Sequence, residues 1–261
     1  MKYYVVDAFA EKVFQGNPAG VFVLEHWLEE ELMQKIAFEN NLAETAFAVK
    51  EGEAYHIRWF TPQYEMDLCG HATLATSFII HKFVEPELQE ILFTSQSGLL
   101  KVEVEEELFT LIFPTRVPER IEVDTRVEEI LHAKVKEAYL GRDLMLVLED
   151  EVSEEALKNL SSDFMKMASY EIGNGMIITA KGESCDFVSR CFYPKAGINE
   201  DPVTGSAHCH LIPYWAERLG KKTLYAKQLS NRGGDIYCTL EGKKVKMSGH
   251  AVLYMEGNVS L

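Results

Sequence analysis

The sequence predicts an α+β protein built from two similar domains, each a curved sheet or half-barrel around a central helix. The run RWFTP at residues 58–62 returns as RCFYP at residues 190–194, an interval of 132 residues (58 to 190). Two small-residue helix starts, GHA at residues 70–72 and GSA at residues 205–207, are 135 residues apart (70 to 205). Three elements in the same order at nearly constant spacing indicate a duplicated unit; the third is a turn glycine before an alternating run, at Gly98 and again at Gly233.

The first half of the chain alternates like a strand meander and has two helical stretches. Strands are expected at residues 3–9, 21–24, 45–49, 56–60, 92–94, 99–104 and 108–113. The turn at residues 17–20 makes the first two a hairpin. Residues 28–39 carry apolar side chains at helical spacing behind three glutamates, which favour a helix N-terminus. Residues 70–80 predict a second helix, apolar enough for burial.

The second half repeats this order of elements. Strands are expected at residues 138–140, 144–148, 176–180, 186–192 and from residue 224 onward, and helices at residues 127–132, 153–160 and 207–219. The proline-flanked run at residues 114–118 breaks the pattern. We therefore predict an N-terminal domain at residues 1–116 and a C-terminal domain at residues 117–261, and we leave open a return of the last strand to the first domain.

Composition excludes several classes of function. The chain has 261 residues and a net charge of −15, from 41 acidic and 26 basic residues, so it repels nucleic acid and anionic membrane surfaces. No apolar stretch approaches the length of a membrane span. The five cysteines lack the spacing of a disulfide framework or a zinc site, and reduced thiols in the cytoplasm are the simplest interpretation. We expect neither nucleic acid nor membrane as a partner.

The two repeated helix starts are candidate sites for a substrate anion. Gly70 and Gly205 each open a helix, where backbone N–H groups lack partners and the helix dipole is positive. The alternative is that each glycine only permits a tight turn into its helix. A pseudo-symmetric pair would bring both helix ends to a cleft between the domains, so the pairing favours a binding site there.

Two carboxylates are candidates for proton transfer. Glu44 follows a short loop and stands among small and apolar residues, a setting suited to a general base; a solvated loop glutamate is the alternative. Asp201 precedes Gly205 by four residues and could act as a second carboxylate or cap the helix. His71 comes directly after Gly70, where the helix dipole should favour the neutral ring. Cys69, at the same helix start, could have a lowered pKa and act as a thiolate base.

No metal or organic cofactor is predicted. His208 and His210 flank Cys209 within a helix, but residues two apart point in different directions and do not form a metal site. Residues 173–175 read GNG and lack the third glycine of a dinucleotide fingerprint, and the chain has no P-loop sequence. Gly205-Ser206-Ala207 offers only half of a nucleophile elbow.

Four blocks, taken in order along nearly the whole chain, resemble the phenazine-biosynthesis PhzF-like isomerase family. They are DAF at residues 7–9 with GNPAG at residues 16–20, NLAETAF at residues 41–47, LCGHAT at residues 68–73, and EDPVTGSA at residues 200–207. The resemblance implies two diaminopimelate-epimerase-like domains with the active site between them. It also implies a homodimer without metal or organic cofactor.

Roles for individual residues follow from the same resemblance. Glu44 is similar to the family's proton-shuttling glutamate, and His71, Asp201 and Ser206 match its supporting active-site residues. Asn17, Gly70 and Gly205 are the positions expected to bind substrate. Related epimerases use a cysteine at each helix start. Here Cys69 resembles the first cysteine, but Thr204 stands at the second, which argues against racemisation by two thiols.

The function expected from these observations is a cofactor-independent isomerase that moves a proton between carbons of a small carboxylated metabolite, with Glu44 as general acid and base. Two alternatives remain open. One is a non-catalytic protein that binds an anionic metabolite in the same cleft. The other is an epimerase that uses Cys69 with a partner other than a thiol. The substrate is not identified by the sequence, because pocket specificity depends on side chains scattered over both domains.

Overall fold

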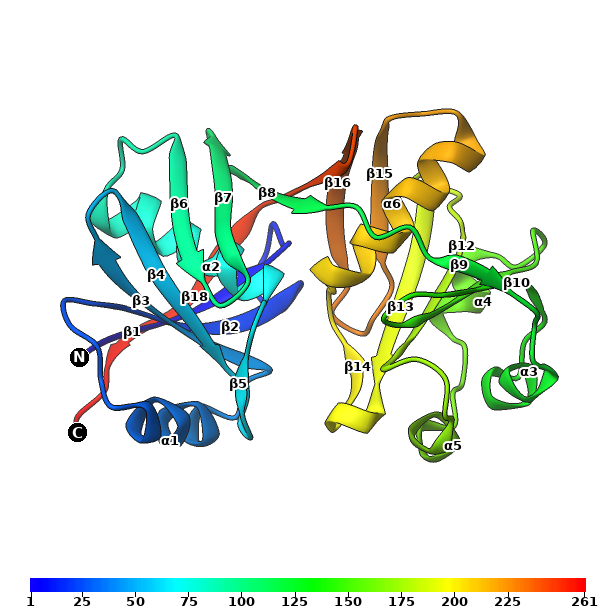
Figure 1. The fold of residues 1–261 in the computed structure, drawn as a ribbon, viewed down its shortest axis with the longest axis horizontal. Helices are drawn as coiled ribbons and strands as arrows, with labels where there is room; N and C mark the ends of the chain where they lie inside the picture. The colour runs from blue at the N-terminus through cyan, green and yellow to red at the C-terminus, as the bar shows by residue number, and fades with distance from the viewer. The chain divides into compact units, whose positions relative to one another are not determined.

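The computed structural model describes residues 1–261 as two compact units (Figure 1). Unit 1 comprises Met1–Phe113 and Met247–Leu261, and unit 2 comprises Pro114–Lys246. The chain therefore passes into unit 2 after β8 and comes back near its end. The predicted boundary lay at residues 116–117, and the segment from Met247 belongs with unit 1, the possibility that the sequence left open.

Unit 1 contains nine strands and a π-helical turn that extends its second helix. Its strands are β1 (Lys2–Ala8), β2 (Asn17–Leu24), β3 (Glu44–Glu51), β4 (Ala54–Phe60), β5 (Glu65–Met66), β6 (Glu90–Ser95), β7 (Gly98–Glu105), β8 (Leu108–Pro114) and β18 (Ala251–Asn258). Its helices are α1 (Glu30–Asn40), α2 (Gly70–Ile79) and the π-turn η1 (Ile80–Val84). The strand β17 (Lys244–Gly249) spans the passage back from unit 2.

The helix α2 is the buried centre of unit 1. Every residue from His71 to Ile79 is buried, and the helix contacts β1, β2, β3 and β18. A helix that is apolar on all sides can only be stable when it is enclosed in this way. The other helix, α1, packs Met33, Ile36 and Ala37 onto aromatic side chains of the strands, among them Phe22 and Phe47. The sheet thus has a helix on each face, and α2 begins with the residues of the candidate site.

Unit 2 has the same kind of architecture. Its strands are β9 (Glu119–Ile121), β10 (Val135–Leu140), β11 (Leu144–Leu148), β12 (Met176–Lys181), β13 (Phe187–Tyr193), β14 (Ile198–Asp201), β15 (Thr223–Gln228) and β16 (Gly234–Glu241). Its helices are α3 (Thr125–Leu131), α4 (Glu154–Lys158), α5 (Phe164–Ser169), the 3₁₀ turn η2 (Pro194–Ala196) and the long α6 (Gly205–Leu219). Most of α6 is buried, as α2 is in unit 1.

The strand pairing confirms the duplication. In unit 1, β1 pairs antiparallel with β2, β2 parallel with β3, β3 antiparallel with β4, β4 parallel with β6, and β6 antiparallel with β7. In unit 2 the series from β10 through β11, β12, β13 and β15 to β16 has the same alternation of directions. In each unit a short strand, β5 or β14, adds antiparallel to the strand before the buried helix. The predicted α+β class is correct.

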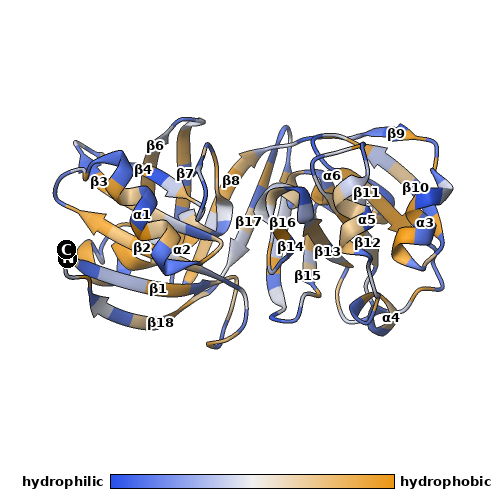
Figure 2. Cartoon of the chain, turned by 90° about the horizontal axis from the view of Figure 1, so that it is seen from below, coloured by the Kyte–Doolittle hydropathy of each residue, from blue (hydrophilic) through white to orange (hydrophobic).

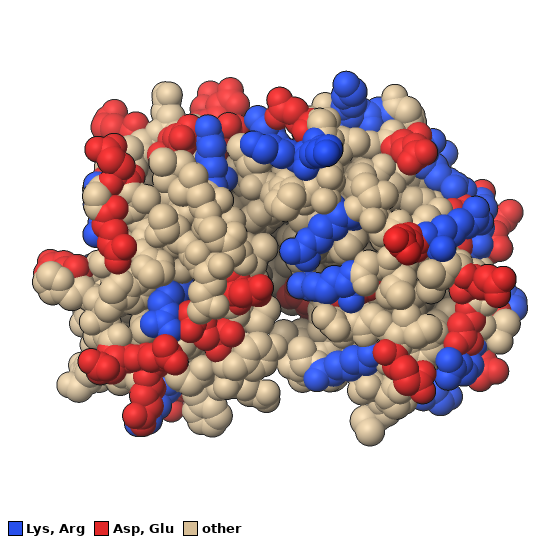
Figure 3. Space-filling view, in the orientation of Figure 1, with Lys and Arg blue, Asp and Glu red and all other residues tan.

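Surface composition agrees with a folded acidic protein. Hydrophobic residues concentrate in the strands and helices, and hydrophilic residues in the turns between them (Figure 2). Both acidic and basic side chains occur over the face in Figure 3. The predicted elements differ from the structure at α5, β9 and β14, which sequence patterning missed, and at β5, which lies between a predicted strand and a predicted helix. The turn predicted at residues 17–20 is wrong, because these residues begin the strand β2.

Candidate active site

Glu44 is the first residue of β3, and its side chain is buried. The preceding residues matter here: α1 ends at Asn40, and Asn41 adopts a left-handed conformation that turns the chain into β3. Parallel pairing of β3 with β2 sets Glu44 opposite Ala19. Glu44 is 7% exposed, so the solvated loop glutamate that the sequence left as an alternative is wrong. A buried carboxylate at a strand start needs a polar partner.

His71 is that partner. Its Nε2 lies 3.2 Å from Oε2 of Glu44, and neither atom has another hydrogen-bond partner. On the other side of the ring, Nδ2 of Asn17 lies 3.1 Å from Nδ1. Nε2 of the ring faces the Glu44 carboxylate and can donate its proton to it. Asn17, His71 and Glu44 therefore form a continuous polar chain within unit 1.

The charge state of His71 differs from the sequence expectation. Burial lowers the pKa of His71, but the neighbouring Cys69 and Glu44 groups outweigh burial and raise the pKa well above its ordinary value. The helix dipole was expected to favour the neutral ring. The helix dipole acts on the ring from a distance, whereas the Glu44 carboxylate is in direct contact with it. The closer charge therefore has the larger effect on the pKa of His71.

The pKa of Cys69 is raised rather than lowered. It is the residue before α2, with Sγ 3.6 Å from Nδ1 of His71. Burial raises the pKa of Cys69, and the charge of Glu44 raises it further. The sequence expectation of a lowered pKa at a helix N-terminus is therefore wrong, because burial beside a carboxylate disfavours a second negative charge.

Glu44, Cys69 and His71 are close enough to be considered as metal ligands, with their donor atoms within 4.8 Å of one another. The thiol lies on the Nδ1 side of the imidazole and the carboxylate on the Nε2 side. The contact of 3.2 Å between Nε2 of His71 and Oε2 of Glu44 also suits proton transfer between the two groups.

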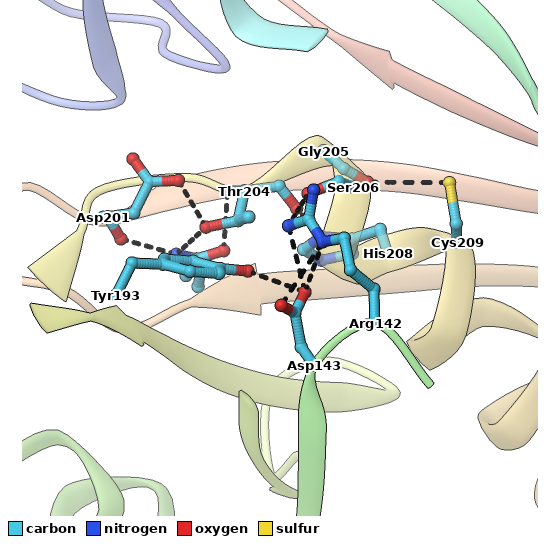
Figure 4. Close-up of polar contacts among 10 residues, drawn as sticks. Arg142, Asp143, Tyr193, Asp201, Thr204, Gly205, Ser206, His208 and Cys209 are labelled. Atoms are coloured by element: carbon cyan, nitrogen blue, oxygen red, sulfur yellow. Dashed lines mark hydrogen bonds and ion pairs between the residues drawn. The ribbon is translucent and has the colours of Figure 1, made fainter. Parts of the chain in front are cut away.

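The remaining predicted residues lie in unit 2 at the start of α6 (Figure 4). Gly205 and Ser206 are its first two residues, and Thr204 precedes them in an extended conformation without a side-chain cap, as Cys69 precedes α2. Asp201 ends β14 and accepts a hydrogen bond of 2.6 Å from the Thr204 hydroxyl. Gln228 accepts from the Thr204 backbone N–H at 2.9 Å. Gly70 opens α2 in unit 1 in the same way.

Sequence reasoning missed a polar cluster beside Ser206. Arg142 donates from Nη2 to the Ser206 hydroxyl at 3.1 Å and to the buried carboxylate of Asp143 at 3.0 Å. Tyr193 donates its hydroxyl to Asp143 at 3.2 Å. The charged pair at residues 142–143 was visible in the sequence, but nothing in its spacing linked it to a helix more than sixty residues later.

The structure therefore brings Asn17, Glu44 and His71 together in unit 1, and Asp201, Gly205 and Ser206 together in unit 2. The convergence of these two groups on one substrate stays a prediction. No helix of the protein combines the length and the apolar character that crossing a membrane requires.

Comparison with known proteins places these residues in a family. The family described as "phenazine biosynthesis-like protein" matches residues 6–257. The chain belongs to this family. It is 47% identical to a protein of Pseudomonas aeruginosa named an uncharacterized isomerase, over 100% of this chain and 99% of that one. A second protein of Pseudomonas aeruginosa and a protein of Halalkalibacterium halodurans have the same isomerase designation, and the chain is an isomerase of this family.

Solved structures confirm the predicted fold. A PhzF family protein of Enterococcus faecalis superposes with a TM-score of 0.97 at 52% identity, covering 100% of this chain and 99% of that chain. A hydroxyproline epimerase of Agrobacterium vitis superposes with a TM-score of 0.62 at 8% identity, covering 98% of this chain and 91% of that chain. The second likeness concerns the fold alone and supports the epimerase-like architecture of the two units.

Proposed function

We propose that this family member is a cofactor-independent isomerase in which Glu44 moves a proton between two carbons of a small carboxylated metabolite. The observation that supports this most is the pairing of buried Glu44 with His71, whose facing atoms have no other hydrogen-bond partner. Buried polar atoms are rarely left without partners unless a ligand or a reaction requires them. Both atoms therefore retain hydrogen-bonding capacity for a substrate.

The chemistry requires one group to act first as base and then as acid. The Glu44 carboxylate takes a proton from a carbon next to an unsaturated or carboxylated centre, and the electron pair of the broken C–H bond moves into that conjugated system. The same carboxyl group returns the proton to another carbon, and the electron pair forms the new C–H bond. Atoms and charge balance without an oxidant or a metal, provided that the intermediate stays bound.

The other residues have binding and orienting roles in this proposal. His71, held by Asn17, hydrogen-bonds the substrate or Glu44 and stabilises the charge that develops during proton transfer. Asp201 and Ser206 orient the substrate's polar groups. The helix starts at Gly70 and Gly205 offer unpaired backbone N–H groups to its carboxylate. The proposal requires both groups of residues to act on the same molecule.

The test is a screen of small carboxylated metabolites in deuterated water, with mass spectrometry of each compound after incubation. An isomerase of this kind produces an isomer and introduces carbon-bound deuterium. A protein that only binds an anionic metabolite, the alternative from a different functional class, leaves the carbon-bound hydrogens unexchanged. Stabilisation of the protein by a metabolite that gains no deuterium would favour the binding protein.

We also propose that the protein acts in the cytoplasm as a homodimer. Five unpaired cysteines suit a reducing compartment. For the dimer, sedimentation equilibrium should give about twice the chain mass of 29.7 kDa. A monomer mass at micromolar concentration would refute the dimer.

A further inference from the structure

Arg142 and Asp143 form a charged pair in the tight connection between β10 and β11. The Asp143 side chain is fully buried, and it accepts hydrogen bonds from Nε and Nη2 of Arg142 and from the Tyr193 hydroxyl (Figure 4). A buried carboxylate requires a counter-charge. Charge compensation alone would account for the presence of an arginine here.

The exposure of Arg142 does not fit a purely structural role. Its side chain remains 36% exposed, and its Nη1 group makes no hydrogen bond. Arg190 provides an internal comparison, because it also pairs with a carboxylate, that of Glu200. The Arg190 side chain is only 10% exposed, and its Nη1 donates to three backbone carbonyls at the end of α4 and just after it. The Nη1 group of Arg142 is therefore left for a ligand, whereas that of Arg190 is not.

The donors that Arg142 leaves open lie beside the first turn of α6. Its Nη2 contacts the Ser206 hydroxyl, one residue into the helix. The preceding Thr204 provides no side-chain cap to the first-turn N–H groups, and its own N–H is taken by Gln228. A guanidinium N–H donor and an uncapped helix start each favour an anion, and here two separate segments of the chain bring them together.

We propose that Arg142 is a specificity-determining residue that binds the substrate's carboxylate together with Ser206 and the first turn of α6. Asp143 is a positioning residue, since it holds the guanidinium by its Nε–Nη2 edge and leaves Nη1 for the ligand. This inference rests on the proposed function, because it identifies the part of that site which recognises the carboxylate.

A carboxylate fits the donors that remain at this site. Asp143 neutralises the charge of Arg142, and Asp201 adds a negative charge next to Thr204, so the site binds an anion through its N–H donors rather than through net positive charge. A carboxylate can take one arginine donor and the backbone N–H groups of the first turn. The substrate class is therefore a carboxylate.

The experiment compares pairs of ligands that differ only in charge. Benzoate and benzamide, and acetate and acetamide, are titrated into the full-length protein by isothermal calorimetry or NMR at low salt. In the unmodified protein each carboxylate should bind about tenfold or more tightly than its amide. In Arg142→Gln this preference should disappear, and in Arg142→Lys, which keeps the charge without the fork, it should be intermediate. Arg126→Gln, an exposed arginine of the same unit that pairs with Asp124, is the matched control and should keep the preference.

A double variant separates binding from folding. Arg142→Gln leaves buried Asp143 without its counter-charge and could unfold unit 2. Arg142→Gln with Asp143→Asn removes both charges, so it should fold and still lack the carboxylate preference. Retention of the preference in a folded Arg142 variant, or its absence in the unmodified protein, would overturn the inference.

The outcome for Arg142 is distinguishable from the outcome for the proposed function. Glu44-dependent deuterium incorporation with an unchanged carboxylate preference in Arg142→Gln would overturn this inference alone. Loss of the preference in Arg142→Gln without any deuterium incorporation would support the carboxylate site and count against the isomerase mechanism.

Discussion

The side chains of Glu44 and His71 show why a buried pair can be reactive rather than only structural. A structural ion pair normally has its remaining lone pairs and protons satisfied by other groups. Here Oε2 of Glu44 and Nε2 of His71 face each other at 3.2 Å and have no further hydrogen-bond partners. Such a pair can exchange a proton with a third molecule without first breaking other interactions.

The pH dependence of stability should report the His71 charge. Burial lowers the pKa of His71, but Cys69 and Glu44 raise it more, so the folded value is above the ordinary 6.5. A raised histidine pKa contributes stability that is fully present below the unfolded pKa and is lost as pH rises through the folded pKa. We therefore expect the difference in melting temperature between the unmodified protein and His71→Gln to be largest below about pH 6.5 and to shrink as the pH rises above it. A difference that grows with pH would contradict the raised pKa.

Cys69→Ala tests the epimerase alternative. Since burial and Glu44 raise the pKa of this thiol, it should not act as a base at neutral pH. We expect deuterium incorporation to fall by less than about tenfold, reflecting a small change in packing near His71. Cys185→Ala, a half-buried cysteine of unit 2, is the control. Complete loss of exchange in Cys69→Ala alone would revive the thiol mechanism.

Among the elements, the two hairpins that lead to the buried helices share a specific ion pair. Arg58 on β4 makes a bidentate contact with Glu65 on β5, and Arg190 on β13 makes the same contact with Glu200 on β14. The arginines are 132 residues apart and the glutamates 135 (65 to 200). We call this Arg–Glu ion pair the clamp. The three extra residues of the second copy thus lie between its arginine and its glutamate, and the duplicated contact is retained around them. Each clamp fixes the strand pair that precedes a helix start.

Removing the clamp should destabilise the two units unequally. Arg190→Met should lower the free energy of unfolding by about 3 kcal/mol, because it removes the donors to Glu200 and to the carbonyls of Lys158 and Leu160. Arg58→Met should cost at least about 1 kcal/mol less, since the hydrogen bonds of Arg58 go only to glutamates, one of them exposed Glu30. Denaturant unfolding of both variants measures the difference. Equal losses would show that the backbone contacts of Arg190 contribute little.

Sequence patterning predicted long, periodic elements well and short ones poorly. Apolar residues at helical spacing predicted the helix α6, and alternating apolar residues predicted the hairpins of β6 to β8. In contrast, α5 has only six residues, and its capping residue Asp163 is its main signal. The strand β5 pairs through two residues of a polar loop, and the Arg58–Glu65 contact stabilises it rather than any propensity. Tertiary contacts, rather than local sequence preference, determine whether such short elements form.

On the scale of the whole molecule, the internal repeat was the sequence feature that said most about the candidate site. Two copies of a helix start in register point to Gly70, His71, Gly205 and Ser206 from the sequence alone, because a duplicated unit places equivalent residues at equivalent ends. Arg142 has no equivalent of this kind. It reaches Ser206 only because β10 and β11 are folded beside α6, a relation that depends on three-dimensional packing and leaves no periodic trace in the sequence.

The most direct test of the central proposal measures proton exchange with and without the Glu44 carboxylate. Glu44→Gln keeps the shape of the side chain and removes its ability to take a proton, and Glu39→Gln, an exposed glutamate of α1, is the matched control. With a metabolite from the deuterium screen, we expect the rate of deuterium incorporation at carbon to fall about 10²- to 10⁴-fold in Glu44→Gln and to stay unchanged in Glu39→Gln. Undiminished incorporation in a folded Glu44→Gln protein would contradict the account.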